Sequence, residues 1–196
     1  MNQLRIELTR LSGVQVDDES WAKIQALHAW LVDEAIPAGG LGPNEAQTVG
    51  QRHLLDSALY SAAWAQPPAK CWDLGTGVGL PGLILAILWP QTEMVLIDRS
   101  QKRIDLTRRA ARVAELTIET ITADIRDLRG PFEAVVSRAA IPAKGFFPLL
   151  QRLLAPGGKA VVSGSGQVPP GFTALEVDLE STILDPAPRL LMMQNS

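Results

Sequence analysis

The sequence predicts an α/β fold, in which a mostly parallel β-sheet with helices on both faces follows an N-terminal helical cap. Residues 1–66 carry apolar side chains at helical spacing, whereas the rest of the chain alternates short apolar runs with helical stretches. The first of these runs ends in a glycine-rich turn, as strands of open α/β sheets often do. Because right-handed crossovers join such runs, we expect a cap at residues 1–66 and one compact α/β unit at residues 67–196.

Length, composition and charge narrow the class of protein. A chain of 196 residues with 46% hydrophobic residues is long enough to bury one core. Its single cysteine excludes an internal disulfide and a multi-cysteine zinc site, and its longest apolar run, residues 80–89, is too short to span a membrane. We therefore expect a cytoplasmic monomer without a metal centre. The net charge of −3 gives no general attraction to nucleic acid, so any RNA contact has to be local.

Two amphipathic helices are predicted in the cap. In residues 17–36 the apolar side chains recur every three or four positions, and Asp17 or Asp18 is available as the N-cap. Residues 37–43 contain three glycines and break this helix. A second helix is expected over residues 44–65, before the prolines at 67 and 68.

Short apolar runs beyond the cap predict the strands of the sheet. The first five runs suit parallel strands, and the last two suit an antiparallel hairpin at one edge of the sheet, joined by the proline-rich residues 185–188. The predicted strands are residues 70–74, 94–97, 117–121, 134–136, 160–163, 174–179 and 189–193.

The segment 73–82, Asp-Leu-Gly-Thr-Gly-Val-Gly-Leu-Pro-Gly, joins the first strand to the helix that follows it. Ligands of open α/β sheets bind outside the carboxyl ends of the strands, and glycine lets a ligand approach the backbone closely. Pro81 suits the first turn of the following helix, where no N–H group is needed. We predict ligand contacts at Gly75, Thr76, Gly77 and Gly79.

Two classes of ligand compete for this loop. Residues 77–82 match the G-x-G-x-x-G pattern of NAD-binding oxidoreductases, and Asp98 follows at the end of the second strand. Asp73, however, completes a D-x-G-x-G-x-G pattern that resembles motif I of class I S-adenosylmethionine-dependent methyltransferases. A carboxylate there suits an ammonium and a sulfonium better than a pyrophosphate. S-adenosylmethionine is therefore the predicted cofactor, and an NAD-dependent enzyme or a non-catalytic binding module is the alternative.

Aspartates at the ends of the next two strands suit the same cofactor. Asp98 is placed to bind ribose hydroxyls. Asp124 follows the third strand, where class I methyltransferases often carry an acidic residue that accepts a hydrogen bond from the adenine amino group. The full set of predicted cofactor contacts is Asp73, Gly75, Thr76, Gly77, Gly79, Asp98, Arg99, Asp124, Ile125 and Arg138.

Four segments together resemble the bacterial family of small-subunit ribosomal RNA guanine-N7 methyltransferases, the glucose-inhibited division protein B family. They are Arg-His-Leu-Leu-Asp-Ser at residues 52–57, the glycine-rich segment 73–82, Lys-Arg at 102–103, and Val-Ser-Arg-Ala at 136–139. The resemblance covers residues 28–165. It implies a seven-stranded sheet with an N-terminal helical extension, S-adenosylmethionine as the cofactor, and N7-methylation of a guanosine in 16S ribosomal RNA, with the small ribosomal subunit as partner.

The resemblance also suggests which side chains meet the substrate. Arg138 is predicted to face the transfer site as the catalytic residue. Contacts to the substrate are expected at Arg52, His53, Lys102, Arg103 and Ser137.

Three segments depart from the family pattern. The cap reads Ile-Pro-Ala-Gly-Gly-Leu-Gly at residues 36–42 instead of Asn-Leu-Thr, Asp124 stands where the family tends to carry arginine, and Ser163 stands where it carries lysine. Fewer cations weaken phosphate contacts, so either the RNA is held differently or the acceptor is a small molecule or another macromolecule.

The chemistry of the predicted reaction needs few protein groups. Methyl transfer from a sulfonium is an in-line displacement, and guanine N7 has a free lone pair at neutral pH, so alignment and exclusion of water are the main tasks. The single cysteine, Cys71, lies inside the first predicted strand, where a buried core thiol is expected and not the nucleophile of cytosine C5 methylation. The segment 137–140 also lacks the Asn/Asp-Pro-Pro-aromatic turn of adenine amino-methylating enzymes.

Overall fold

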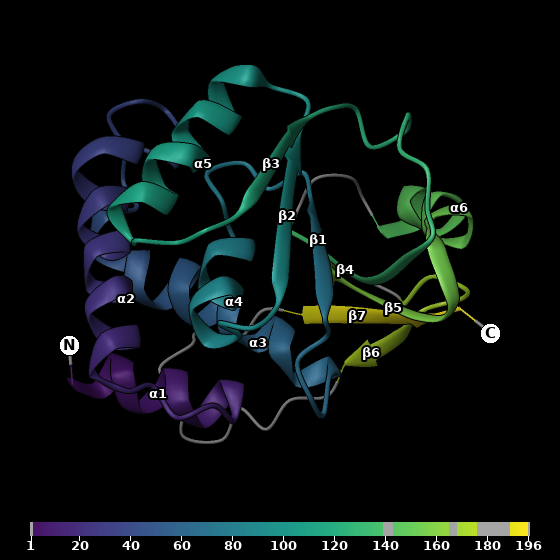
Figure 1. The fold of residues 1–196 in the computed structure, drawn as a ribbon, viewed down its shortest axis with the longest axis horizontal. Coiled ribbons are helices and arrows are strands. Elements are labelled where there is room, and N and C mark those ends of the chain that lie inside the picture. Colours follow the sequence, from purple (N-terminus) through teal and green to yellow (C-terminus); the bar gives the residue numbers. More distant parts are fainter. Residues whose placement is uncertain (1, 139–142, 165–167, 176–188, 196) are drawn as a thin grey trace.

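The computed structural model describes residues 2–138, 143–164, 168–175 and 189–195, and it places helices on both sides of a central sheet (Figure 1). The cap contains α1 (Asn2–Ser12), α2 (Asp18–Trp30), η1 (Leu31–Ala35), η2 (Ala46–Thr48), η3 (Val49–Leu55), α3 (Asp56–Leu59) and η4 (Tyr60–Ala63). The remainder contains β1 (Lys70–Leu74), α4 (Gly82–Leu88), β2 (Glu93–Asp98), α5 (Gln101–Val113), β3 (Glu119–Thr122), β4 (Phe132–Ser137), α6 (Ala143–Leu153), β5 (Leu154–Gly164), β6 (Thr173–Leu175) and β7 (Arg189–Gln194).

The sheet has the order β3-β2-β1-β4-β5-β7-β6. Strands β1 to β5 pair in parallel, whereas β7 pairs antiparallel with both β5 and β6. The predicted seven-stranded, mostly parallel sheet with an antiparallel pair at the C-terminal side is therefore confirmed. The chain reverses its direction of strand addition between β1 and β4, and this switch point is where open α/β sheets bind ligands.

Most strands differ from their predicted limits by one or two residues, and β5 and β6 differ by more. Strand β5 begins six residues before the predicted start at Ala160, because Phe132 in β4 also pairs with Leu154 across a register shift. In the predicted hairpin, β6 covers the start of residues 174–179, while residues 176–188, including the proline-rich connection, lie outside the described residues. Strand β6 forms the sheet edge, and β7 lies one position further in.

Successive side chains of a strand point to opposite faces of the sheet, so each face has its own hydrophobic core. In β2, Leu96 packs into a cluster with the cap helices and α4, whereas Val95 and Ile97 pack into a second cluster with Phe146 and Leu150 of α6. Figure 1 shows the cap, α4 and α5 on one side of the strands and α6 on the other. The first cluster runs without a break from α1 to the sheet, so the cap is packed against the α/β part of the chain.

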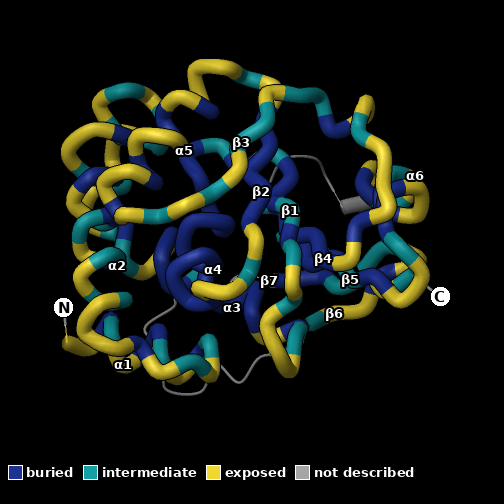
Figure 2. Tube along the Cα trace, in the orientation of Figure 1, coloured by how far each residue is buried: buried dark blue, intermediate teal, exposed yellow. Residues whose placement is uncertain are grey.

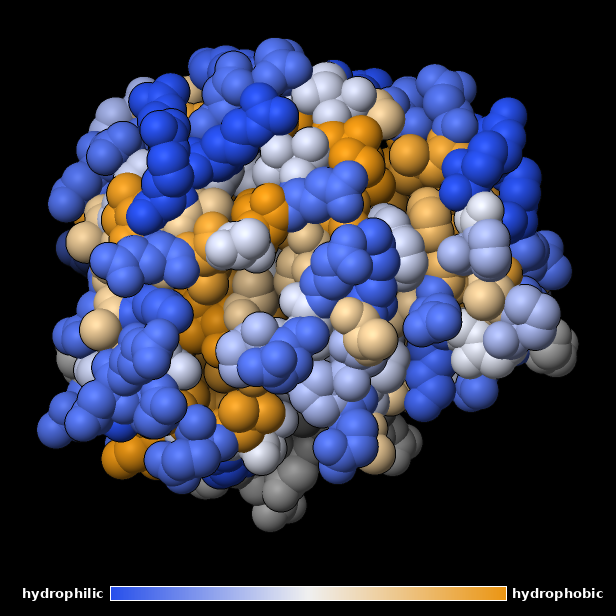
Figure 3. Space-filling view, in the orientation of Figure 1, coloured by the Kyte–Doolittle hydropathy of each residue, from blue (hydrophilic) through white to orange (hydrophobic). Residues whose placement is uncertain are grey.

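Helix α4 is buried along its whole length, because it lies between the sheet and the cap. Figure 2 shows it in the buried colour, with exposed residues concentrated on α1, α2 and α5. Its apolar composition therefore reflects a central packed helix. No helix among the described residues is long and apolar enough to cross a membrane. The face seen in Figure 3 is mostly hydrophilic, with apolar patches between the helices and the strands.

The cap contains one helix more than predicted. Helix α1 packs against the second cap segment, where a Cβ on Gly50 would lie 3.3 Å from the Leu4 side chain. The predicted helix at residues 17–36 is confirmed, and Asp17 is its N-cap, accepting a hydrogen bond of 2.8 Å from the Ser20 N–H. The predicted helix at residues 44–65 is a succession of short 3₁₀, π and α segments, η2 to η4.

Candidate functional site

A cavity of about 570 Å³ lies at the carboxyl ends of β1 to β4, within the size range of small-molecule sites. Its walls come from the segments that follow these four strands and from two residues of the cap. The lining residues are Gly40, Leu41, Gly75, Thr76, Gly77, Val78, Leu80, Asp98, Arg99, Arg103, Ala123, Asp124, Ile125, Arg126 and Arg138.

The loop between β1 and α4 directs its backbone N–H groups into the protein. The N–H groups of Gly75 and Thr76 donate to the Ile97 carbonyl (2.8 and 2.9 Å), and those of Gly79 and Leu80 donate to the Thr76 carbonyl (3.0 and 3.1 Å). The Gly77 N–H donates to Asp98 Oδ2 (3.1 Å), and the Gly82 N–H donates to Asp73 Oδ2 (2.8 Å). A phosphate-binding loop keeps such groups for the ligand. These six N–H groups already have acceptors in the protein, so this arrangement disfavours the predicted alternative of a pyrophosphate-binding NAD site.

Three glycines of the loop have positive φ angles, each with a different surrounding. Gly77, at φ +65°, lines the cavity, and a Cβ there would meet no protein atom within 4 Å. Its backbone is thus open to a ligand. A Cβ on Gly79 would lie 2.3 Å from Leu83 Cδ1, so Gly79 is required for packing, and it is not among the residues that line the cavity; its cofactor contact stays a prediction. Gly75, at φ +74°, also lines the cavity.

Asp73 lies behind the loop and is fully buried. Its Oδ2 accepts hydrogen bonds from the Thr76 hydroxyl (2.6 Å) and the Gly82 N–H (2.8 Å), while Oδ1 has no partner among the described residues. Burial raises the pKa of Asp73 to about 6, against the lowering effect of these two bonds. Asp73 therefore holds the loop in shape and does not line the cavity, where a direct cofactor contact was predicted.

Asp98 stands at the end of β2 and faces the cavity. Its two carboxylate oxygens accept the N–H groups of Gly77 (3.1 Å) and Ser100 (2.9 Å). Arg103 lies 3.7 Å from Oδ2. Asp98 thus connects the glycine loop to the start of α5, and each carboxylate oxygen has further acceptor capacity for a hydroxyl-bearing ligand.

Asp124 and Ile125 also line the cavity, after β3. The Asp124 carboxylate accepts the Arg126 N–H at 2.9 Å and lies 3.5 Å from the Arg126 guanidinium. Asp98 and Asp124, predicted to share one edge of the sheet, are therefore brought to one cavity. This follows from the register, since Asp98 pairs with Thr122 at the ends of β2 and β3.

Arginines surround this pair of aspartates. Arg99, Arg103, Arg126 and Arg138 line the cavity, and the side chains of Arg103 and Arg126 are 59% and 66% exposed. Four cations against two carboxylates give the cavity wall a net positive charge within a chain whose net charge is −3. A local basic site of this kind is what an acidic protein needs in order to bind a polyanion.

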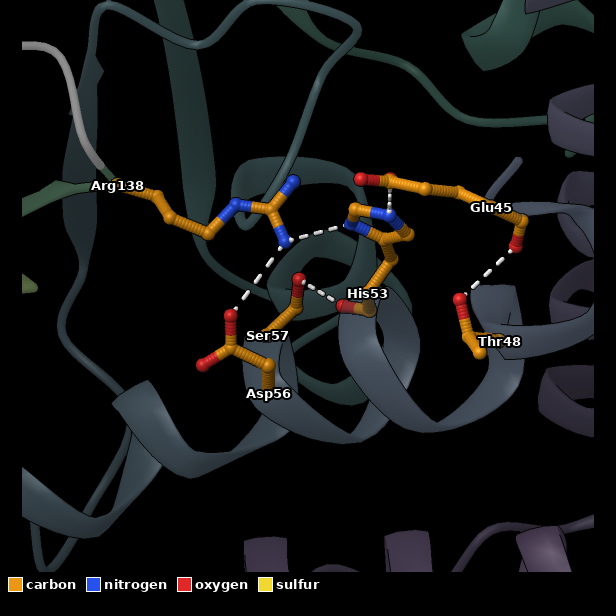
Figure 4. A network of polar contacts seen from close by, with 6 residues as sticks. All are labelled: Glu45, Thr48, His53, Asp56, Ser57 and Arg138. Atoms are coloured by element: carbon orange, nitrogen blue, oxygen red, sulfur yellow. Dashed lines mark hydrogen bonds and ion pairs between the residues drawn. The ribbon is translucent and has the colours of Figure 1, made fainter. Parts of the chain in front are cut away.

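Arg138 follows β4 and reaches toward the cap (Figure 4). Its Nη1 lies 3.1 Å from His53 Nδ1 and 3.5 Å from Asp56 Oδ2, and Glu45 contacts the other ring nitrogen of His53. Desolvation, followed by the charge of Arg138, lowers the pKa of His53. Burial raises the pKa of Asp56, partly offset by Arg138. These four side chains, from separate parts of the sequence, form one network at the edge of the cavity.

The residues predicted to contact the substrate differ in whether they line the cavity. Arg103 lines the cavity, whereas Arg52 and Lys102 are exposed away from it. His53 is buried and contacts Arg138 instead of the cavity. Ser137 is also buried and does not line the cavity, and its hydroxyl donates to the Leu74 carbonyl at 2.6 Å, so it connects β4 to β1. The reason is strand geometry, since the last side chain of β4 points into the sheet and the next one leaves it.

Six residues of the cavity wall were not predicted from the sequence: Gly40, Leu41, Val78, Leu80, Ala123 and Arg126. Gly40 and Leu41 come from the cap segment that departs from the family pattern, and a Cβ on Gly40 would lie 2.4 Å from Val78 Cγ1. Only the close approach of Gly40 to the loop reveals that this cap segment lines the cavity. Arg126 has a sequence signal, because it lies two residues after Asp124 at a strand end, but its charge is exposed there and resembles any surface arginine.

With this strand order and this loop, the chain is a class I S-adenosylmethionine-dependent methyltransferase. Solved structures agree on the fold. Magnesium protoporphyrin IX methyltransferase from Synechocystis PCC 6803 matches with a TM-score of 0.60 and 16% identity, over 92% of this chain and 98% of that one. Ribosomal protein L11 methylase from Lactobacillus delbrueckii matches with a TM-score of 0.55 and 18% identity, over 77% and 80%.

The sequence defines the family within this class. The model of the GidB family, described as rRNA small subunit methyltransferase G, matches residues 22–167. A protein named ribosomal RNA small subunit methyltransferase G from Chromohalobacter salexigens is 33% identical, over 84% of this chain and 82% of its own length. Its namesake from Leifsonia xyli is 30% identical, over 80% and 76%. The chain belongs to the GidB family, and the predicted family resemblance is confirmed.

Proposed function

We propose that the chain transfers the methyl group of S-adenosylmethionine to N7 of a guanosine in the 16S RNA of the small ribosomal subunit, in the cytoplasm. The single observation that carries this proposal is the cavity wall, which combines the open backbone of Gly77 with Asp98, Asp124 and four arginines. The names of the relatives support the RNA of the small subunit as the acceptor.

The residues present fit the cofactor. Space above Gly77, where a Cβ would meet no atom, suits a ligand lying directly on the backbone. Asp98 would accept hydrogen bonds from the ribose hydroxyls, and Asp124 with Ile125 would hold the adenine. Gly75, Thr76 and Arg99 complete the same wall. When bound, S-adenosylmethionine would supply an electrophilic methyl group on a sulfonium.

The acceptor nitrogen needs orientation more than it needs a base. Guanine N7 has a free lone pair, so the protein has to align the base, exclude water and leave N7 unblocked. Arg138 suits this task because arginine donates to the O6 and N7 edge of guanine. Donation to O6 alone would leave N7 free for attack. The same donor would face the amino group of adenine unfavourably, which favours guanine over adenine as the acceptor.

The arginines also bring positive charge to the cavity, whereas the family pattern places its cations at positions 124 and 163. Ser163, at the position of the family lysine, pairs with Leu190 inside the sheet and does not line the cavity. Asp124 stands at the position of the family arginine. Arg126 lies beside it, and the exposed guanidinium of Arg126 brings positive charge to the cavity wall. We infer that Arg99, Arg103 and Arg126 contact RNA phosphates around the cavity, so binding should weaken steeply with salt.

The experiment combines transfer and binding. Small ribosomal subunits from cells lacking the gene are incubated with the purified chain and S-adenosylmethionine carrying a labelled methyl group, and the RNA is digested to nucleosides. We expect the label in 7-methylguanosine. An unlabelled RNA, with S-adenosylhomocysteine still bound in calorimetry, would overturn the ribosomal acceptor and point to a small molecule or another macromolecule. Binding of NAD without binding of S-adenosylhomocysteine would overturn the cofactor as well.

A further inference from the structure

The guanidinium of Arg138 is held by the cap, at a point far from Arg138 in the sequence. Among the described residues, Nη1 makes both of its contacts with the cap, to His53 Nδ1 at 3.1 Å and to Asp56 Oδ2 at 3.5 Å. His53 and Asp56 lie one helical turn apart at the junction of η3 and α3, and Figure 4 shows both side chains turned toward Arg138. Two contacts to one nitrogen fix the direction of a long and otherwise flexible side chain.

The contact fixes the protonation state of His53. Arginine has donors and no acceptor, so Nδ1 has to present a lone pair to it. The ring proton therefore lies on Nε2, which donates to the Glu45 carboxylate. Glu45, just before η2, thus selects the tautomer in which Nδ1 accepts. The relay runs from Glu45 through a neutral imidazole to Arg138, and it ends at the cavity wall.

We infer that His53, with Glu45 behind it, is a positioning residue that aims Arg138 at the methyl acceptor. This inference rests on the proposed function, and it reassigns His53 from a substrate contact to a residue that acts through Arg138. Protonation of Nδ1 would replace the acceptor with a donor that carries positive charge, opposite another positive charge. The hydrogen bond would then be lost and Arg138 would be pushed away from its aim.

The charged and titratable groups around this relay set the direction of its pH response. Glu45, Arg52, Arg138, Asp56, Tyr60 and Asp73 are the groups that act on His53 or on its partners. Desolvation and Arg138 keep the pKa of His53 below its ordinary value of 6.5, so the ring is neutral at physiological pH. The turnover rate should therefore be constant around neutral pH and fall as the pH drops through the pKa of His53.

Two substitutions at position 53 separate positioning from folding. His53→Asn keeps an acceptor, because the amide Oδ1 stands two bonds from Cβ, as Nδ1 does, and it cannot titrate. His53→Ala removes the acceptor. We expect kcat on small subunits to fall on the order of 10- to 100-fold in His53→Ala, since a small misplacement at a transfer site has effects of that size. His53→Asn should recover most of this loss and lack the acidic fall in kcat.

A third substitution acts on the relay without touching Arg138. Glu45→Gln keeps a hydrogen-bond acceptor for Nε2 but removes the negative charge that raises the pKa of His53. The acidic fall in kcat should then move to lower pH. The control is His28→Ala, because His28 is the other histidine of the chain and does not line the cavity, so kcat and its pH profile should be unchanged.

The outcomes distinguish this inference from the proposed function. S-adenosylhomocysteine affinity and melting temperature report whether each variant is folded, and both should stay near wild-type values in His53→Asn and Glu45→Gln. A wild-type chain that leaves small-subunit RNA unmethylated would defeat the proposed function. A wild-type chain that methylates this RNA, with the same kcat in His53→Ala, would overturn the positioning role. An acidic fall that persists in His53→Asn would also overturn it, because a group other than His53 would then be responsible for the titration.

Discussion

Replacement of Gly77 by alanine adds one methyl group over the cavity and meets nothing in the protein itself. A Cβ at this position has no protein atom within 4 Å, so the folded chain offers no steric resistance. The left-handed backbone, at φ +65°, disfavours alanine by about 1–2 kcal/mol. For a chain of this length, that destabilisation lowers the melting temperature by about 2–8 °C. Gly77→Ala should therefore fold at room temperature.

The same methyl group would occupy the space in which the proposed cofactor lies on the backbone. One added methyl group in a packed site is unfavourable by about 1–3 kcal/mol. Converted to affinity, this is a rise in Kd of about 5- to 150-fold. Titration calorimetry with S-adenosylhomocysteine measures it directly, and the methylation assay should show the matching loss at limiting cofactor.

Gly13 provides the matched control for backbone strain. It has φ +67°, a Cβ there would also meet no atom within 4 Å, and it follows α1 without lining the cavity. Gly13→Ala should show a similar fall in melting temperature and wild-type affinity for S-adenosylhomocysteine. If Gly77→Ala binds this ligand as tightly as Gly13→Ala does, the ligand does not lie on the loop and the reasoning from the open backbone is refuted.

Three further predictions test the surroundings of the loop. Asp98→Asn keeps an acceptor but loses its charge, so the affinity for S-adenosylhomocysteine should fall about 5- to 10-fold by calorimetry, as charged acceptors exceed neutral ones by about 1 kcal/mol. The exposed Asp105→Asn serves as its control. The pKa of Asp73 is about 6, so its folded form binds a proton more tightly than the unfolded form, and stability is lost as the pH rises. In urea unfolding, Asp73→Asn should therefore gain about 1 kcal/mol relative to wild type between pH 5 and pH 8. Gly40→Ala brings a Cβ to within 2.4 Å of Val78 Cγ1 and 3.0 Å of the Ala35 carbonyl, and it should lower the unfolding free energy by about 1–3 kcal/mol.

Each of these has a clear contrary result. Equal affinities of Asp98→Asn and Asp105→Asn would remove Asp98 from the cofactor site. A difference between Asp73→Asn and wild type that does not change with pH would mean that the carboxyl titrates near its ordinary value of 3.8. A Gly40→Ala variant of wild-type stability would show that the cap segment moves freely over the loop.

Much of the fold was predictable because it depends on local periodicity. Short apolar runs fixed the strands, and the register of parallel strands then brought Asp98 and Asp124 to one cavity as predicted. The direction of a side chain at a strand end was less predictable. Asp73 and Ser137 both stand at strand ends facing the cavity edge of the sheet, yet both side chains turn into the core. Their burial depends on what lies behind the loop, which a single sequence does not reveal.

The cap shows the same limit at longer range. Helical spacing predicted its second half but not the mixture of 3₁₀, π and α turns in it, because tertiary contacts decide these. The approach of Gly40 to Val78 and of His53 to Arg138 joins segments that are far apart in the chain. The sequence shows each of these residues, but it does not show which distant residue each one contacts.

Strand β7 follows β6 in the sequence, but it lies between β5 and β6 in the sheet. In the described part of the chain, β6 is hydrogen-bonded to the sheet only through β7, although the ribosome makes β6 earlier. A nascent chain that has emerged only as far as β6 thus lacks the strand with which β6 pairs, and β5 keeps an open edge until β7 arrives. Completion of the sheet must therefore wait for residues 189–194, and a polypeptide interrupted before them would expose an unpaired strand to its neighbours.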